Sequence, residues 1–374
     1  MFFLAALAFL AGCATSSQET LPPDWSGTNE IHSVTNVPVL TNILVHVRTN
    51  QPPMFHTNQV LRPAPVLTWT SLDRWAKENK LDPPLHLSSS PLSTWSLTSK
   101  YGRLVLALGS REITWNGLTL HIAFPPEPVD NQIFVHGLDL QKNLEPLLLG
   151  ETLTFPGTNR VIVIDPGHGG INAGTLNVLG GSPEKVYTLD WAKRLVPLLE
   201  SNGWTVFLTR TNDLDVSLLN RVAIAEAHHA DLFISLHFNS SAPDKKQSGL
   251  ETYCLTPTGM PSTLTRGYSD LLTDNYINNA FDVQNLLLAV RLHGAVLRAS
   301  GEEDRGIRRA RFMGVLHGQH RAAVLIEGGF LSNPNESRRI GQPAFRQKLA
   351  EAVASALRIN EDRRVKMEDG HGAH

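Results

Sequence analysis

Five continuous apolar runs alternate with helical patterns between residues 160 and 359, and this alternation constrains the fold more than any other feature. Such runs are typical of strands buried on both faces of a sheet. They are VIVID (161–165), WTVFLT (204–209), DLFISL (231–236), LETYCL (250–255) and AAVLIE (322–327). Helical spacing fills residues 182–199, 217–229, 283–299 and 343–359. The alternation predicts an α/β fold with one open, largely parallel sheet and helices on both faces.

A second folded region precedes this sheet. Short strand-like runs occupy residues 103–108, 112–115 and 118–123, the last after an Asn116-Gly117 turn, and a helical pattern covers 71–79. We therefore predict a small β-rich domain over residues 66–150. It contains no cluster of catalytic residue types, so it is interpreted either as a spacer or scaffold, or as a module that binds a glycan or a partner.

The first twelve residues, MFFLAALAFLAG, are apolar or small, too few for a membrane span but suited to a signal peptide. The run ends at Cys13 in a sequence that resembles a bacterial lipobox, which predicts lipidation of Cys13. A signal peptide without lipid and a buried apolar strand remain alternatives. No Lys or Arg precedes the apolar run, although a signal peptide normally has one there, so a start codon further upstream stays open. Residues 13–65 are predicted to be a flexible tether, and residues 360–374 a polar tail.

Composition excludes several classes of function. The chain has 374 residues, and 33 Lys plus Arg against 35 Asp plus Glu give a net charge of −2. A generally basic surface for nucleic acid is therefore not expected. Only two cysteines occur, Cys13 and Cys254, so a disulfide framework and a CxxC-type zinc site are excluded. Cys254 lies in an apolar run and is predicted to be a buried structural thiol.

Three residues of catalytic type lie where the apolar runs end, which is where open α/β sheets bind ligands. His168 follows VIVID in a glycine-rich turn, His237 follows DLFISL, and Glu327 ends AAVLIE. Each alone is an ordinary polar residue, but their coincidence predicts a site. Glu184 has two interpretations: an acidic residue favoured by the helix dipole, or the third ligand of a catalytic zinc beside His168 and His237.

Six ordered segments carry a resemblance to a known family. They are VIVIDPGHGG, PEKVYTLDWAKRL, GWTVFLTRTND, ADLFISLHFNS, GLETYCL and AVLIEGGFLSNPNE. In order and spacing they resemble the zinc-dependent N-acetylmuramoyl-L-alanine amidases of the Amidase_3 type, over about residues 160–359. The resemblance implies one Zn²⁺ held by His168, Glu184 and His237, and Glu327 as the catalytic glutamate. It also implies that peptidoglycan is the substrate.

The implied reaction is hydrolysis of the amide between N-acetylmuramic acid and L-alanine by a zinc-activated water, with Glu327 as general base. It would serve cell-wall remodelling, daughter-cell separation or recycling. We expect Asn239, Arg308 and Arg309 to contact the substrate. A zinc peptidase, a zinc deacetylase and a non-catalytic wall-binding protein are the alternatives.

The resemblance also bears on location and regulation. With Cys13 lipidated, the protein is expected at the periplasmic face of the outer membrane, held by its lipid anchor. In some relatives a helix near residues 257–282 covers the site until a protein activator displaces it. Here residues 268–276 are predicted to form one short helix, and the segment is either such a cover or a surface excursion. His317 and His320 are outside candidates for contact with the ligands or the substrate.

Overall fold

The computed structural model describes residues 69–358, apart from residues 91, 131, 155–159 and 266–269. The predicted signal peptide, Cys13, the predicted tether and the predicted tail lie outside these residues. The described residues all belong to one compact unit. Within the described part, no helix combines the length and apolar character that crossing a membrane requires.

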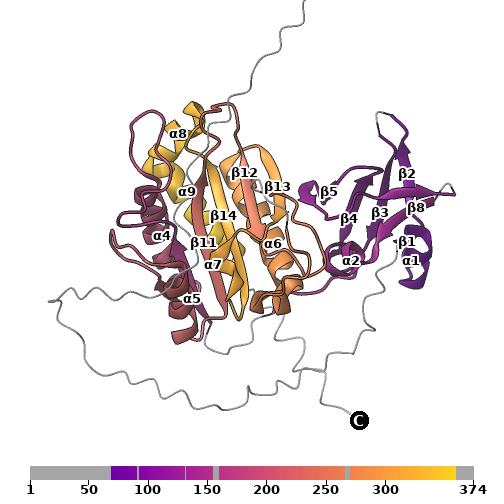
Figure 1. Cartoon of the computed structure of the whole chain (residues 1–374), viewed down its shortest axis with the longest axis horizontal. Coiled ribbons are helices and arrows are strands. Elements are labelled where there is room, and N and C mark those ends of the chain that lie inside the picture. The colour runs from indigo at the N-terminus through magenta and orange to yellow at the C-terminus, as the bar shows by residue number, and fades with distance from the viewer. Residues whose placement is uncertain (1–68, 91, 131, 155–159, 266–269, 359–374) are drawn as a thin grey trace, which may run out of the picture. The chain divides into compact units, whose positions relative to one another are not determined.

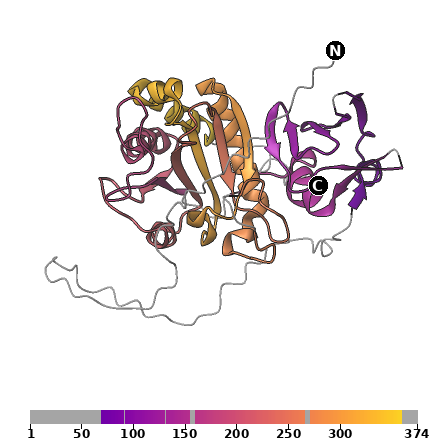
Figure 2. The same cartoon turned by 45° about the horizontal axis from the view of Figure 1, so that its top comes forward.

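The C-terminal part of the chain, shown from magenta to yellow in Figures 1 and 2, alternates strands and helices as predicted. Its elements are β9 (Val161–Pro166), α4 (Glu184–Ser201), β10 (Thr205–Leu208), α5 (Leu218–Ala227), β11 (Leu232–Asn239), β12 (Leu250–Cys254), the 3₁₀ turn η2 (Ile277–Phe281), α6 (Asp282–Ser300), β13 (Asp304–Arg309), α7 (Gly314–His317), β14 (Ala322–Phe330), α8 (Pro334–Gly341) and α9 (Pro343–Ala356).

These strands belong to a mixed sheet. β10, β9, β11 and β14 are neighbours in that order and are parallel, as the sequence predicts. β12 runs antiparallel to β14, and β13 is parallel to β12. The reversal arises because residues 240–249, which connect β11 to β12, contain no helix, and a parallel return needs a longer crossover. Helix α6 supplies such a crossover between β12 and β13.

Alternation along the buried strands creates two cores. Residues on one face of the sheet pack with α4, α6 and α9, and residues on the other face pack with α5 and α7. The first core includes Ile162, Ile164, Ile234, Val324, Trp191, Leu292 and Leu349. The second includes Val161, Val163, Phe233, Leu325, Ala225 and Leu316. Helices thus cover both faces, as predicted for strands without a polar face.

The N-terminal part contains most of the predicted β-rich region. Its elements are β1 (Trp69–Ser71), α1 (Leu72–Glu78), β2 (Leu85–Ser88), β3 (Thr94–Ser99), β4 (Gly102–Ala107), β5 (Glu112–Trp115), β6 (Leu118–His121), β7 (Glu127–Val129), β8 (Gln132–His136), α2 (Gly137–Asp139), the π turn η1 (Leu140–Leu144) and α3 (Glu145–Leu148).

Two sheets involve these elements. β1, β8 and β7 form a small antiparallel sheet, whereas β2 to β6 form an antiparallel meander. β6 also pairs in parallel with β13 through Leu120 and Ile307, so the meander and the C-terminal strands form one 11-stranded sheet. The division into domains 66–150 and 160–359 stays a prediction, but the two parts share backbone pairing.

Candidate active site

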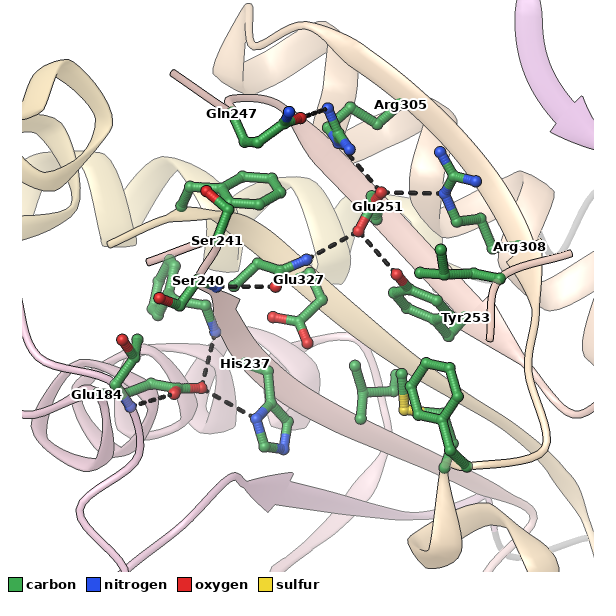
Figure 3. Close-up of a pocket in the computed structure, with 18 of the residues that line it drawn as sticks. Glu184, His237, Ser240, Ser241, Gln247, Glu251, Tyr253, Arg305, Arg308 and Glu327 are labelled. Carbon is green, nitrogen blue, oxygen red and sulfur yellow. Dashed lines mark hydrogen bonds and ion pairs between the residues drawn. The ribbon is translucent and has the colours of Figure 1, made fainter. Parts of the chain in front are cut away.

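Two of the polar residues predicted at the strand ends, His237 and Glu327, lie in one row with Glu251 across three adjacent strands. His237 of β11 pairs with Glu327 of β14, and Glu327 pairs with Glu251 of β12 on its other side. Paired residues of adjacent strands project to the same face of a sheet. All three line one cavity of about 760 Å³, which also contains His168, Glu184, Asn239 and Arg308. In Figure 3, Glu327 lies between His237 and Glu251.

Glu184 is the centre of one end of this cavity. It is only 3% exposed, at the first turn of α4. Its Oε2 accepts from His168 Nε2 at 3.0 Å, and its Oε1 accepts from His237 Nδ1 at 3.0 Å. The backbone N–H groups of Thr175 and Phe238 donate to the same carboxylate, at 3.1 and 3.0 Å. Four donors therefore fix its position.

The same three side chains can hold a metal. One ligand atom from each of His168, Glu184 and His237 lies within 4.8 Å of the others. When the two imidazoles are deprotonated, these atoms form the His, Glu, His donor set of a catalytic zinc site. His168 Nδ1 lies 2.8 Å from Asn172 Oδ1, a partner of the kind that orients a ligating imidazole.

The loop that carries His168 is held tightly. Gly174 has a φ of +68°, and a Cβ there would lie 2.6 Å from Glu184 Oε2, so a side chain would displace the ligand. Arg221 donates to the His168 carbonyl at 2.8 Å, and Arg210 donates to the Gly167 carbonyl at 2.8 Å. His168 itself has a φ of +61°, and these two guanidinium groups stabilise that conformation.

The charges at this end depend on one another. Burial opposes ionisation of Glu184, but hydrogen bonds from His168 and His237 outweigh it and hold the pKa of Glu184 far below its usual range. Burial likewise lowers the pKa of His168, but the hydrogen bond to Glu184 and its charge outweigh this, so the pKa of His168 is raised. The carboxylate therefore stays ionised at neutral pH, as a metal ligand requires.

Glu251 is the centre of the other end of the cavity. It is 2% exposed, and both of its oxygens accept two hydrogen bonds (Figure 3). Arg305 Nε and Arg308 Nε donate to Oε1, each at 3.0 Å, while Asn239 Nδ2 and Tyr253 Oη donate to Oε2, each at 2.8 Å. Burial first, then the charges of Glu251 and Glu327, raise the pKa of Tyr253 far above its usual value, so its hydroxyl remains a donor.

Comparison with known proteins identifies the family. The model of the Amidase_3 family, described as N-acetylmuramoyl-L-alanine amidase, matches residues 162–358. The chain belongs to the Amidase_3 family. AmiA of Salmonella typhimurium, an N-acetylmuramoyl-L-alanine amidase, is 31% identical over 222 residues, which are 54% of this chain and 76% of AmiA.

Further relatives carry the same description. The amidase AmiC of Escherichia coli O6:H1 is 32% identical over 243 residues, covering 59% of this chain and 58% of AmiC. Among solved structures, the catalytic domain of the Paenibacillus polymyxa amidase CwlV is 29% identical, covers 53% of this chain and 96% of that chain, and has a TM-score of 0.44. The chain is therefore an amidase that hydrolyses an amide bond of peptidoglycan.

Arg309, which was predicted to contact the substrate, does not line the cavity. This amidase has a bulge in β13: Leu250 pairs with Asp304, but Thr252 pairs with Ile307, so β13 has one extra residue. The bulge places Arg305 and Arg308 on the cavity face. Arg309 projects to the opposite face, is 2% exposed, and donates to Asn143 Oδ1 and to backbone carbonyls.

Other candidates also lie outside the cavity. His317 contacts the Arg311 carbonyl and stacks on Tyr276, and neither His317 nor the exposed His320 lines the cavity of this amidase. Cys254 is buried and free, as predicted. A short helix was predicted at residues 268–276. Residues 270–276, which the structure describes, are not helical, and the first helical turn of this region begins at Ile277. Within the longer segment 257–282, which was predicted to be either a cover or a surface excursion, Leu264 and Thr265 line the cavity.

Sequence reasoning missed Glu251 and Arg305. Glu251 lies inside an apolar run whose pattern predicts only a buried strand. An acidic residue in such a run needs partners, and this requirement marks it as notable. The identity of those partners depends on strand pairing, since Arg305 and Arg308 are 54 and 57 residues away.

Proposed function

We propose that this amidase hydrolyses the bond between N-acetylmuramic acid and L-alanine with one Zn²⁺ held by His168, Glu184 and His237, and with Glu327 as the catalytic base. The observation that carries the proposal is the pairing of His237 with Glu327 on adjacent strands, which sets the general base beside the ligand set. The alternatives, a peptidase or a deacetylase, have no comparable support from the family.

The three ligands suit zinc. His168, Glu184 and His237 are the His, Glu, His donor set typical of catalytic zinc sites, and all three line the cavity. Gly174 leaves room for the Glu184 carboxylate. Zn²⁺ bound there supplies Lewis-acid activation of a water molecule and of the scissile carbonyl. The protein's own task is to orient the ligands, and the backbone N–H groups of Thr175 and Phe238 do this for Glu184 by donating to its carboxylate.

Glu327 moves the proton. Its side chain is 7% exposed and lines the cavity from the strand next to His237. A carboxylate in that place accepts the proton of the attacking water and delivers it to the nitrogen of the departing L-alanine. Protonation of that nitrogen is required because an amide anion is too poor a leaving group. No covalent nucleophile is needed, and Cys254 is buried away from the cavity lining.

Arg308 and Asn239 are the proposed substrate contacts. Both line the cavity, and the Nε of Arg308 is bound to Glu251. Among the described residues, the two terminal amino groups of Arg308 make no hydrogen bond, so they are able to bind a carboxylate of the stem peptide, the peptide that begins with L-alanine. Asn239 is oriented by its Nδ2, which donates to Glu251, and by its Oδ1, which accepts from the Ser240 N–H at 2.8 Å and has a second lone pair for a substrate donor.

Location and role follow from residues outside the described part. We propose that residues 1–12 direct export, that Cys13 is lipidated, and that the tether lets the enzyme reach the wall from the periplasmic face of the outer membrane. In that place the reaction serves wall remodelling, daughter-cell separation or recycling. A protein activator stays a prediction.

The test is a digest of purified peptidoglycan with and without a chelator, read by mass spectrometry. An amidase releases stem peptides with a free L-alanine N-terminus, and chelation stops the release until Zn²⁺ is added back. Acetate release would instead indicate a deacetylase, and cleavage within the stem would indicate a peptidase. Either result would overturn the proposal.

A further inference from the structure

Strand β6 of the N-terminal part contacts β13 at the bulge that positions the arginines of the active site. The backbone N–H of Thr119 donates to Asp304 Oδ2 at 2.8 Å, and His121 Nε2 donates to the Arg305 carbonyl at 3.1 Å. Leu120, between them, pairs with Ile307. Three consecutive residues of β6 therefore bind the backbone and side chains of residues 304–307.

The bulge depends on this neighbour. Gly306 has a φ of +90°, a conformation that other residues rarely adopt, and a Cβ there would lie 2.9 Å from both His121 Nε2 and Thr119 Cγ2. Asp304 closes the bulge from the other side, since its Oδ1 accepts from the Gly306 N–H at 2.8 Å and from His293 Nε2 at 2.9 Å. The extra residue is thus fixed between β6 and α6.

The consequence reaches the cavity. In a regular strand, Arg305 and Arg308 would project to opposite faces, because side chains alternate. With the bulge, both guanidinium groups bind the same oxygen of Glu251. Arg305 is further fixed by Gln247 Oε1 at 2.8 Å, and its guanidinium lies over the ring of Phe330. Two arginines against one glutamate leave a net positive charge beside Glu327.

We propose that β6 is a specificity element of the active site: it holds the bulge that keeps Arg305 and Arg308 on the cavity face, where they bind a carboxylate of the stem peptide. This inference rests on the proposed function for the identity of the ligand. Glu251 lies two strands from His237, about 10 Å at the usual strand spacing, so the arginines reach a carboxylate two to three residues from the scissile bond. His121, Thr119 and Asp304 act through the arginines and are positioning residues.

The test replaces His121 in the full chain. His121→Leu removes the donor to the Arg305 carbonyl while keeping an apolar side chain of moderate size, and His121→Gln keeps an N–H donor. His136→Leu is the matched control, because His136 is also a partly buried histidine of the N-terminal part but contacts the N–H of Leu138 and the ring of Phe124. The substrates are two muramyl peptides that differ only in having free carboxylates or carboxamides.

We expect His121→Leu to reduce the preference for the carboxylate peptide, as a ratio of kcat/KM values, by about tenfold. His121→Gln restores most of it, and His136→Leu retains it. The change lies in KM, and zinc affinity measured with a chelating dye is unaltered. An unchanged preference in folded His121→Leu, or an equal loss on both peptides, would overturn the proposal.

Calorimetric binding of the product peptide separates this proposal from the proposed function. The wild-type chain is expected to bind the product with free carboxylates more tightly than its carboxamide form, and His121→Leu to lose this difference. Such a result supports the role of β6 even if neither muramyl peptide is cleaved, which would overturn only the amidase assignment. Equal binding of both forms by the wild type would overturn the role of β6 while cleavage proceeds.

Discussion

The two ends of the cavity are built around the same residue type in the same degree of burial. Glu184 and Glu251 are 3% and 2% exposed, and each accepts four hydrogen bonds. The partners differ. Two of the donors to Glu184 are imidazoles, whose ring nitrogens can each offer a lone pair to a metal ion, whereas two of the donors to Glu251 are guanidinium groups, which have only donors.

This difference decides what each glutamate can do. When the two imidazoles are neutral, each can donate a nitrogen lone pair to a metal ion beside the Glu184 carboxylate. Permanent positive charges around Glu251 exclude a cation and attract an anion instead. The burial of a carboxylate therefore does not by itself indicate its role. The chemical type of their donors, imidazole or guanidinium, indicates whether the place suits a metal ion or a carboxylate ligand.

The largest effect is expected from Glu184→Ala. Removing the carboxylate leaves only two imidazole ligands, so zinc affinity falls by more than the roughly 10- to 100-fold typical of losing an outer partner. Asn172→Ala, which removes only the partner of His168 Nδ1, is the control for that smaller loss. Zinc content after dialysis and competition with a chelating dye measure the loss of zinc affinity in both variants. Equal losses in the two variants would contradict a ligand role for Glu184.

Glu327→Ala should separate chemistry from metal binding. Zinc content stays at the wild-type level because Glu327 is not among the three ligands, while kcat falls by about 10²- to 10⁴-fold, the usual contribution of a general base. Steady-state rates on muramyl peptides and metal analysis check the two halves independently. Wild-type turnover in this variant would remove the assignment of the base.

Glu251→Gln should affect only the arginine end. The substitution leaves Arg305 and Arg308 without their buried counter-charge, which is expected to cost about 3 kcal/mol of unfolding free energy. KM for anionic peptides also changes because the two guanidinium groups lose their orientation. Urea unfolding and kinetics measure these effects, and zinc affinity serves as the control. A matching loss of zinc would mean that the two ends are not independent.

Asp304→Asn should give the smallest effect, and a pH-dependent one. Burial opposes ionisation of Asp304, but hydrogen bonds from His293, from the Thr119 N–H and from the Gly306 N–H outweigh it and lower its pKa. A lowered folded-state pKa stabilises the protein above the unfolded value of 3.8, and this stability is lost as the pH falls below it.

The wild type should therefore exceed Asp304→Asn in unfolding free energy at pH 7 by on the order of 1 kcal/mol, since solvent screens a half-buried carboxylate. The difference should shrink below pH 4. Urea unfolding at pH 7 and pH 3 measures it. A difference that stays constant with pH would show that the charge of Asp304 does not hold the bulge.

Much of the fold is predictable because buried parallel strands have a distinctive composition. All five apolar runs contain strands, and the four helices expected between and after them are present as α4, α5, α6 and α9. Helix α8 is missed because its eight residues are mostly polar. The antiparallel direction of β12 is missed as well, because strand direction depends on which neighbour a strand pairs with, and composition does not indicate the neighbour.

The site divides in the same way. His168, His237 and Glu327 are predictable because the carboxyl ends of parallel strands meet at one edge, and their positions follow from three local patterns. Glu251 and Arg305 are not, because their roles arise from pairing between β12, β13 and β14 and from a bulge that β6 supports. Arg308 and Arg309 are adjacent in one strand, so alternation already forbids that both face the cavity.

The row from His237 through Glu327 to Glu251 has a consequence for how such an enzyme can be altered. Its spacing is set by the backbone ladder of three adjacent strands and by no loop. A single-residue insertion within β14 ahead of Glu327 would move the general base to the face of the sheet opposite the cavity and so abolish turnover. Loops around the cavity are free of this restriction. Redesign of substrate range should therefore exchange the connections and leave strand lengths untouched.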